Sequence, residues 1–456
     1  MTGLAVAAAL GVLLLLGHAV VAFVSPTLRL SWYERWGVAW LLGTATGGFL
    51  WFVLSPLYRW VSPLWLLTVI AMAFGALALT RQRVAPDYAE AGSPAGADLD
   101  KVSVVLGTVL VVQAAALLGA AMLTPLGWDG LFNFELKARM AFEHDPRGQL
   151  PLAYFSDLSR VWSHASYPML VPFSEFWIYS WVGQVNQSAV KILFPLFYLS
   201  LIAVVCGTVR RVSGTRAALL VGVALGTLPP LTLRNGAASG YADVPLAAAI
   251  AAAVCFTYMA LRVNDARSML LPAALSAAAA WTKAEGLMLA VVIGLAGFAA
   301  QPGRRAATLL WLPLVVIAPW LALQHLYGAS QGGDFHAVTA TTFVGNLHRI
   351  PTIAAGVARE LVRPGHWALI WPAFAVTLAS AMTTGRLTRA ESFLAGVVVV
   401  PLALYCGVYL FSAWPSVREH MGWSLVRVLV PLAPVALVFV SIRLSDPLSE
   451  TGQRWA

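Results

Sequence analysis

Residues 102–139 read VSVVLGTVLVVQAAALLGAAML-TPLG-WDGLFNFELKAR, a long apolar run followed at once by a polar and aromatic segment. The apolar part, 102–123, is long enough to cross a bilayer, because a membrane-spanning helix needs ~20 apolar residues. Most of the remaining chain is apolar sequence broken by short arginine-bearing turns. Polar side chains gathered beside a membrane, on a segment that does not cross it, indicate a site of chemistry.

The composition places the chain among helical membrane proteins. Hydrophobic residues make up 59% of its 456 residues and charged residues only 11%, whereas a soluble globular protein carries roughly 25% charged residues. The formal net charge of +9 comes from arginines in short turns, as the positive-inside rule produces, so we expect no nucleic-acid partner. Three cysteines lie in apolar runs without CxxC spacing, which predicts core residues and no disulfide: Cys206, Cys255 and Cys406.

Apolar runs along the whole chain predict an all-α polytopic membrane protein with about thirteen transmembrane helices. They lie near residues 4–24, 37–54, 63–80, 102–123, 189–208, 216–233, 244–261, 268–281, 286–300, 306–325, 366–382, 392–411 and 427–443. The run 268–281 is short for a span. Residues 168–183 are also apolar and aromatic, which predicts a re-entrant or surface-lying helix.

A polar linker predicts the domain organisation. Residues 86–101 are rich in Ala, Gly, Pro and Asp, and we interpret them as a cytoplasmic linker after an N-terminal three-helix membrane appendage, 1–85. The functional membrane core is expected at 102–444, with its first large outer loop at 125–188. Residues 445–456 are expected to form a cytoplasmic tail.

Basic residues in the short turns predict the orientation of the bundle. If the spans alternate, the arginine-bearing turns share one side of the membrane, which the positive-inside rule makes the cytoplasm. The first basic residues follow the first apolar run, the reverse of a signal peptide, so we expect an uncleaved first helix with its N-terminus outside. The extracytoplasmic side then holds the segment after Thr124, the turns 233–243 and 282–285, and the loops 327–365 and 412–426.

The polar segment after the span at 102–123 predicts an amphipathic helix lying along the outer membrane surface. Asp129, Asn133 and Lys137 are spaced four residues apart and form one polar stripe on a helix. The simplest interpretation of such a stripe is a solvated face. Asp129, however, follows Trp128 at the mouth of a span, where partial burial suits a carboxylate to accept a proton.

Two other outer turns bring acids and bases to the same membrane face. The turn LRNGAASGYADVP contains Arg234, Tyr241 and Asp243, and the turn WTKAEG contains Lys283 and Glu285. Ionisable residues at span ends that face a bundle are functional candidates by default. A snorkelling lysine with a partner glutamate is an equally simple structural alternative.

Further candidates lie in two more outer segments. Arg427 directly precedes an apolar run, so its guanidinium must stay at the surface or meet an anion, and a lipid phosphate would satisfy it bidentately. His420 lies on the same segment, and His164 and Tyr167 precede a proline on the outer side. No histidine pair has HExxH-type spacing, so the ligand spacing does not support a divalent metal, and we expect no required cofactor.

The order of these motifs resembles that of the bacterial GT-C integral membrane glycosyltransferases, a superfamily that includes the dolichyl-phosphate-mannose mannosyltransferases. The motifs are Trp-Asp, Lys-Ala, His-x-x-Tyr-Pro-x-Leu-x-Pro, Gly-Tyr-Ala-Asp, Thr-Lys-Ala-Glu-Gly and Ser-Leu-Val-Arg, which begin at residues 128, 137, 164, 240, 282 and 424. The resemblance covers 102–444. Many relatives carry an Asp-Glu or Glu-Asp pair where this chain has Trp-Asp-Gly, so the match is to a subgroup and leaves the sugar open.

The resemblance implies a GT-C-like bundle in the bacterial inner membrane and an inverting sugar transfer on its extracytoplasmic face. It implies a polyprenyl-phosphate sugar donor, a glycan, lipid or protein acceptor, and contact with membrane lipid. Asp129 then has the position of the general base, with Asp243 and Glu285 as further carboxylates of the catalytic site. The cations expected at the donor phosphate are Lys137, Lys283, Arg234 and Arg427. The residues expected to contact substrate are Trp128, Asn133, His164, Tyr167, Tyr241 and His420.

Two other classes of function stay open. A transporter or flippase of a lipid-linked or anionic substrate would show paired halves and charges or broken helices near mid-membrane. Here the charges gather at one face and the halves do not match. A structural or assembly subunit would use the outer polar residues only to solvate its loops. Replacement of Asp129 by Asn separates an enzyme from both.

Overall fold

The computed structural model describes residues 1–25, 30–84, 100–144, 152–157, 159, 163–328, 333–385 and 387–445. Over these residues the regular structure is helical, and one isolated antiparallel bridge joins Phe335 to Ser412. The predicted all-α class is confirmed. The predicted linker and tail lie almost wholly outside the described residues, and the domain boundaries stay predictions.

The first half of the chain forms α1 (Thr2–Val24), α2 (Trp32–Val53), η1 (Ser55–Leu57), α3 (Pro63–Val84), α4 (Lys101–Leu123), the π-helix η2 (Gly130–Glu135), α5 (Leu136–His144), α6 (Leu152–Ser156), α7 (Leu170–Val182), α8 (Gln187–Val190) and α9 (Leu193–Gly226). The second half forms α10 (Pro229–Thr232), α11 (Asp243–Arg262), η4 (Ala266–Met269), α12 (Leu270–Ala280), α13 (Ala284–Ala300), α14 (Thr308–Tyr327), α15 (Ala340–Gly345), η5 (Leu347–Arg349), α16 (Ile350–Leu361), α17 (Pro364–Trp367), α18 (Ile370–Thr383), α19 (Arg389–Leu410), α20 (Val417–Leu429) and α21 (Ala433–Ser445).

Seven helical stretches of the described chain are long and apolar enough to cross a membrane, or eight if the bent pair α20 and α21 counts as one span. These stretches define a multi-pass α-helical membrane protein. All the predicted apolar runs coincide with helices, but the predicted thirteen spans are not confirmed. The reason is length, because four further apolar helices are only 10–17 residues long: Pro63–Leu79, Ala266–Ala280, Ala284–Ala300 and Ile370–Thr383.

The chain doubles back within α9. Gly214 interrupts the helix with φ +88°, a left-handed conformation that glycine adopts without steric cost. Across this break the Sγ atom of Cys206 lies 3.2 Å from the carbonyl oxygen of Ala218, although twelve residues of straight helix would separate them by ~18 Å. The predicted runs 189–208 and 216–233 therefore correspond to the two arms of a helical hairpin.

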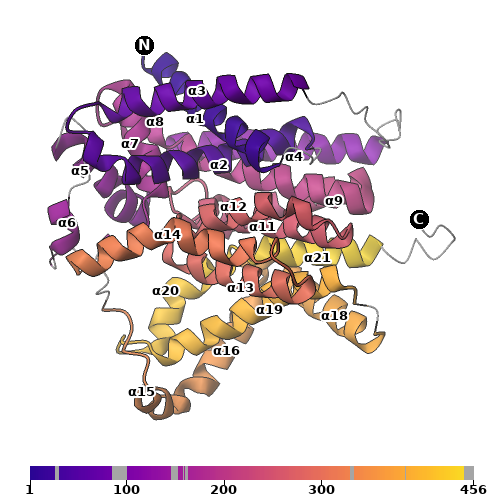
Figure 1. The fold of residues 1–456 in the computed structure, drawn as a ribbon. Helices are drawn as coiled ribbons and strands as arrows, with labels where there is room; N and C mark the ends of the chain where they lie inside the picture. The colour runs from indigo at the N-terminus through magenta and orange to yellow at the C-terminus, as the bar shows by residue number, and fades with distance from the viewer. Residues whose placement is uncertain are drawn as a thin grey trace.

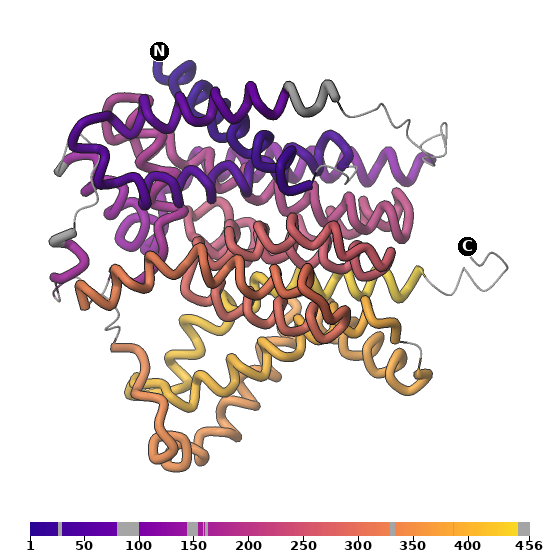
Figure 2. Tube along the Cα trace, in the orientation of Figure 1, coloured from indigo at the N-terminus to yellow at the C-terminus, as the bar shows by residue number. Residues whose placement is uncertain are grey.

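Helix α2 lies inside the bundle, against α9, α7 and α1. Its Trp40 packs edge to face on Phe197 of α9, with ring centroids 5.5 Å apart. The buried Glu34 of α2 forms an ion pair with Arg211, also of α9. Since a buried carboxylate is stable only when it is paired, this contact fixes α2 against α9. Figures 1 and 2 show α2, α4, α9, α11 and α21 running side by side.

The polar segments lie at opposite ends of the bundle. Arg216 pairs with Asp100, the N-cap residue of α4, whereas Asp129 follows the other end of the same helix. A helix of 23 residues is ~34 Å long, which matches the thickness of a bilayer core. The arginine turn around Gly214 and the segment after Thr124 are thus separated by about one membrane thickness.

A bend between the last two helices positions Arg427. The axes of α20 and α21 differ by 50°, and Arg427 lies in the last turn of α20, just before this bend. Helix α20 packs against α16 and α19. In Figures 1 and 2 these helices form the lower part of the view, with α15 and α16 at its edge.

Candidate functional site

The segment after α4 is helical, but its polar face is not solvated. It begins with the π-helix Gly130–Glu135 and continues as α5; a π-helix adds a residue to the turn and is frequent at functional sites. The exposed fractions of Asp129, Asn133 and Lys137 are only 7%, 1% and 0%. The solvated face is therefore the wrong interpretation of this stripe, because the segment packs against α7 and the three side chains are buried inside the protein.

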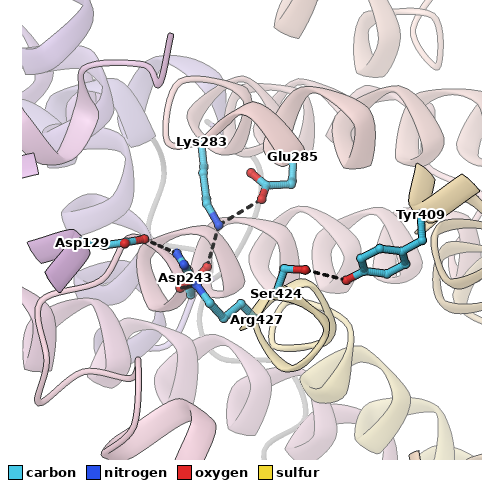
Figure 3. A network of polar contacts seen from close by, with 7 residues as sticks. All are labelled: Asp129, Asp243, Lys283, Glu285, Tyr409, Ser424 and Arg427. Carbon is cyan, nitrogen blue, oxygen red and sulfur yellow. Dashed lines mark hydrogen bonds and ion pairs between the residues drawn. The ribbon is translucent and has the colours of Figure 1, made fainter. Parts of the chain in front are cut away.

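Two cations and three carboxylates form one network at this end of the bundle, as Figure 3 shows. The Nε atom of Arg427 donates to Asp243 Oδ2 at 3.0 Å, and its Nη2 atom donates to Asp129. The Nζ atom of Lys283 lies 2.9 Å from Asp243 Oδ1 and 3.0 Å from Glu285 Oε1. Asp243 therefore bridges the two cations.

Helix ends bring these charges together in favourable positions. Asp243 is the first residue of α11, and Glu285 lies in the first turn of α13. Arg427 lies in the last turn of α20. Carboxylates near helix N-termini and a cation near a C-terminus each interact favourably with the helix dipole. The network therefore joins segments far apart in sequence through their helix ends.

The turn 236–241 packs tightly against the start of the polar segment. The backbone N–H of Gly127 donates to the carbonyl oxygen of Ser239 at 2.7 Å. A Cβ atom on Gly127 would lie 2.6 Å from the ring of Tyr241, which only a glycine at this position avoids. The same ring lies 5.0 Å from the guanidinium of Arg427, within cation–π distance.

A strained turn carries His164 and Tyr167 to the network. His164 has φ +45°, which is uncommon outside glycine and typical of functional turns. Its carbonyl oxygen accepts a hydrogen bond from Lys137 Nζ at 2.8 Å, and its ring stacks on Tyr167 at 4.7 Å. The Tyr167 ring centroid lies 5.8 Å from Lys137 Nζ and 5.7 Å from Lys283 Nζ, within cation–π distance of both.

The two buried lysines differ in charge because their neighbours differ. Burial lowers the pKa of Lys137 to about 7, and the attraction of Asp129 opposes this only in part. Burial acts in the same direction on Lys283, but Asp243 and Glu285 outweigh it and hold the pKa of Lys283 above its ordinary value. At neutral pH Lys283 is charged, whereas Lys137 is divided between its charged and neutral forms.

A cavity of about 720 Å³ opens beside the network. Its wall includes three members of the network, Lys283, Glu285 and Arg427. Asp129 and Asp243 contact these cations from outside the lining. The other predicted residues of the wall are His164, Tyr167 and His420, and the residues that sequence reasoning did not assign to the site include Asp334, Phe335, Tyr405, Tyr409, Trp414 and Ser424.

The structure does not bring all predicted residues to this cavity. Arg234 is exposed in the turn after α10. Trp128 is 63% exposed, and its ring packs on Phe132 with centroids 4.5 Å apart. Asn133 is buried, and its amide atoms have no hydrogen-bond partner among the described residues. Neither Arg234 nor Trp128 is among the residues that line the cavity, and their predicted roles stay predictions.

One of the missed features has a sequence signal. Tyr405 and Tyr409 lie four residues apart near the outer end of the predicted span 392–411, so a helix places both on one face. The segment around Phe335 has no comparable signal. It joins the wall through a bridge to Ser412 and through the hydrogen bond from Trp414 Nε1 to Asp334 Oδ1 at 2.9 Å, both contacts between residues distant in sequence.

The described parts of the chain contain no set of side chains arranged as ligands for a metal ion. No group of three His, Cys, Asp or Glu side chains there is arranged to hold a metal ion. The chemistry that this geometry offers is therefore that of charge pairs, with two cations, Lys283 and Arg427, and two carboxylates, Glu285 and Asp334, at the cavity wall.

Comparisons with known proteins add no relative. No protein-family model matches the chain, and a search of the curated proteins finds no match either. The resemblance to the GT-C glycosyltransferases stays a prediction, and the function has to be argued from the geometry of the site.

Proposed function

We propose that the protein transfers a sugar from a polyprenyl-phosphate donor to an acceptor hydroxyl at this cavity. The observation that carries the proposal is the network at one end of a membrane bundle, in which Lys283 and Arg427 line the cavity and three carboxylates hold them. The proposal places the cavity on the extracytoplasmic face of a bacterial inner membrane, as the arginine turns at the opposite end predict.

Among the described residues, both cations keep a hydrogen-bond donor for a phosphate. Lys283 has three N–H donors and uses two of them, on Asp243 and Glu285. Arg427 uses Nε on Asp243 and Nη2 on Asp129, which leaves its Nη1 group. Cations already fixed in place stabilise the negative charge that develops on a departing phosphate without reorganising during the reaction.

Asp129 is the residue to which we assign the role of general base. The acceptor oxygen forms a bond to the anomeric carbon while its proton passes to the carboxylate, and polyprenyl phosphate leaves with the electron pair of the broken C–O bond. Attack from the face opposite the phosphate inverts the anomeric carbon. Asp129 is 7% exposed and held by Arg427, so the acceptor hydroxyl has to approach it along the edge of the guanidinium.

The proposal is tested by assaying purified protein with a panel of polyprenyl-phosphate hexoses and pentoses. Asp129→Asn is expected to lower the transfer rate by a factor of ~10²–10⁴, the usual contribution of a general base. The matched control is Asp265→Asn, which changes the N-cap carboxylate of η4, far from the network, and is expected to keep wild-type activity. Full activity of Asp129→Asn together with loss of activity in Glu285→Gln would move the base to Glu285. If no donor in the panel supports transfer, the proposed function is ruled out.

A transporter or flippase of the same lipid-linked substrate is the second candidate. The 50° bend between α20 and α21 favours it, because broken helices are typical of transporter binding sites. Against it, the charges lie at helix ends rather than along the helices. Protein in liposomes distinguishes the two: a transporter moves the lipid-linked sugar between leaflets unchanged, whereas the proposed enzyme consumes it.

A further inference from the structure

Two polar atoms at the wall of the cavity are left without a hydrogen-bond partner by the part of the chain that the structure describes. They are Oε2 of Glu285 and the hydroxyl oxygen of Tyr405, both buried and both unpaired within the described chain. Both residues line the cavity. Because a buried unpaired polar atom is unfavourable for folding, native proteins keep few of them, and an instance at a cavity wall marks a position that water or a ligand would satisfy.

The unpaired hydroxyl of Tyr405 is specific to this position. Tyr409, one turn further along α19, also lines the cavity, but its hydroxyl contacts Ser424 Oγ at 2.8 Å (Figure 3). Ser424 Oγ in turn donates to the carbonyl oxygen of His420 at 2.8 Å. The wall therefore carries two tyrosines on the same face of α19. The hydroxyl of one is hydrogen-bonded, and the hydroxyl of the other has no partner among the described residues.

The carboxylate of Glu285 is fixed so that one oxygen stays available. Its Oε1 atom is held by Lys283 Nζ at 3.0 Å, which leaves Oε2 as an acceptor. Glu285 and Tyr405 line the same cavity. A tyrosine hydroxyl both donates and accepts, whereas an ionised carboxylate only accepts.

From this arrangement we infer that Glu285 and Tyr405 form a subsite that binds hydroxyl groups of a sugar ring. The subsite rests on the proposed glycosyl transfer and deepens it. A hydroxyl donates to Oε2 of Glu285 and a neighbouring hydroxyl exchanges a hydrogen bond with Tyr405, while a phosphate at Oε2 would meet a like charge. The stacked rings of Trp414 and His420, 4.9 Å apart in the same wall, add an aromatic surface for the apolar side of the ring.

Binding measurements on the full-length protein in detergent test the subsite. The probes are undecaprenyl phosphate and the panel of undecaprenyl-phosphate sugars, and the readout is the ratio of their dissociation constants. Wild type is expected to bind one sugar-bearing lipid at least about tenfold tighter than the bare lipid phosphate. Tyr405→Phe is expected to reduce this ratio about fivefold, the effect of one neutral hydrogen bond, and to leave binding of bare undecaprenyl phosphate unchanged. Glu285→Gln is expected to reduce the ratio further.

The matched control is Tyr409→Phe, which removes a hydroxyl that already has a partner and is expected to leave the ratio at the wild-type value. If Tyr405→Phe keeps the ratio but raises the KM for the acceptor, the bound hydroxyls belong to the acceptor. If both quantities stay at wild-type values while transfer continues, the subsite is overturned and the proposed function stands. If wild type shows neither a preference for a sugar nor transfer, the proposed function fails, and the subsite fails with it.

Discussion

Arg427 joins two buried carboxylates that come from different segments of the chain. It donates to Asp243 through Nε and to Asp129 through Nη2, so its loss leaves both without this cation. Removing one partner of a buried ion pair costs about 3–5 kcal/mol, because the remaining charge stays buried and uncompensated. Arg427→Met is therefore expected to lower the midpoint of thermal unfolding, measured by intrinsic fluorescence in detergent.

Arg427→Lys, measured in the same way, distinguishes the effect of the positive charge from the effect of the planar guanidinium. A lysine keeps the positive charge but lacks the planar fork that contacts two carboxylates at once. It is expected to lie between wild type and Arg427→Met in stability. A midpoint for Arg427→Met equal to that of wild type would show that the network contributes nothing to folding.

The lowered pKa of Lys137 predicts that donor binding depends on pH. This pKa of about 7 lies far below the ordinary lysine value of 10.5, so Lys137 gains a proton as the pH falls through 7. Lys137 and the network then carry three positive charges against three carboxylates, whereas above pH 7 they carry one positive charge fewer. For charges ~15 Å apart the difference is on the order of 1 kcal/mol at an effective dielectric constant of ~20, or about fivefold in affinity. The KM for the donor is expected to rise about fivefold between pH 6 and pH 8.

Lys137→Gln, which does not titrate, is expected to abolish that slope. Arg139→Gln, on the exposed face of α5, is the control and is expected to keep the wild-type profile. The same depressed pKa makes the free energy of unfolding increase with pH between about 7 and 10.5, because the unfolded chain binds the proton more tightly there. A profile that stays unchanged in Lys137→Gln would assign the slope to another group.

At the scale of elements, the turn 236–241 directly precedes α11 and packs against the start of the polar segment. Gly240 adopts φ +78°, and a Cβ atom there would lie 2.4 Å from a methyl group of Leu126. Gly240→Ala is therefore expected to introduce both backbone strain, about 1–2 kcal/mol, and a clash that displaces Tyr241 and Asp243. We expect a lower unfolding midpoint together with a loss of transfer activity.

Gly214→Ala is the matched control for that substitution. Gly214 has φ +88°, but open space surrounds its Cβ position, so an alanine there brings strain without a clash. It is expected to lower the unfolding midpoint and leave the activity of the folded protein unchanged. Equal activity of the two variants would show that the position of the turn 236–241 does not matter to the site.

Hydropathy predicted where the helices lie better than how many of them cross the membrane. A backbone in lipid has to satisfy its own hydrogen bonds, so long apolar runs become helices. The number of spans depends on lengths near the threshold, which α12 and α18 fail to reach. The polar stripe of Asp129, Asn133 and Lys137 was predicted, but the burial of all three side chains was not, since periodicity shows that a helix has two faces but not which of them meets water.

The sequence predicted that the charged residues gather at one end of the bundle, because successive predicted spans cross the membrane in alternating directions. Asp129, Asp243, Lys283 and Arg427 each lie at the outer end of a predicted span, and the structure places them in one network. Their individual contacts were beyond the sequence, because they depend on long-range packing. The bridge that brings Phe335 to the cavity wall is an example, since it joins residues 77 positions apart.

At the scale of the whole molecule, the two polar ends differ in kind. One carries the network of carboxylates and cations beside a cavity, and the other carries arginine turns such as the one around Gly214. Positive charge near the surface favours the cytoplasmic face, which would place the cavity outside. The orientation therefore decides whether the proposed donor and the site meet in the same leaflet.

Labelling with a membrane-impermeant maleimide tests this orientation. Ser188→Cys and Thr215→Cys each place a thiol at an exposed serine or threonine, one before the first arm of α9 and one at the turn that ends it. That arm spans residues 193–213, so it is ~31 Å long and separates the two thiols by about a bilayer core. In a background where Cys206, Cys255 and Cys406 are replaced by alanine, the thiol at 188 is expected to react in intact cells. The thiol at 215 is expected to react only after lysis.

The unsubstituted cysteine-free protein is the control for labelling of other groups, and transfer activity of both variants shows that the fold is intact. The reverse pattern would place the network at the cytoplasmic surface, where the arginine turns would then face outward against the charge bias of the chain. Sugar transfer on the extracytoplasmic face would be excluded, even if Asp129 and Arg427 proved essential. Labelling of both thiols in intact cells would mean that the first arm of α9 does not span the bilayer, and the separation of the two polar ends by the membrane would fail with it.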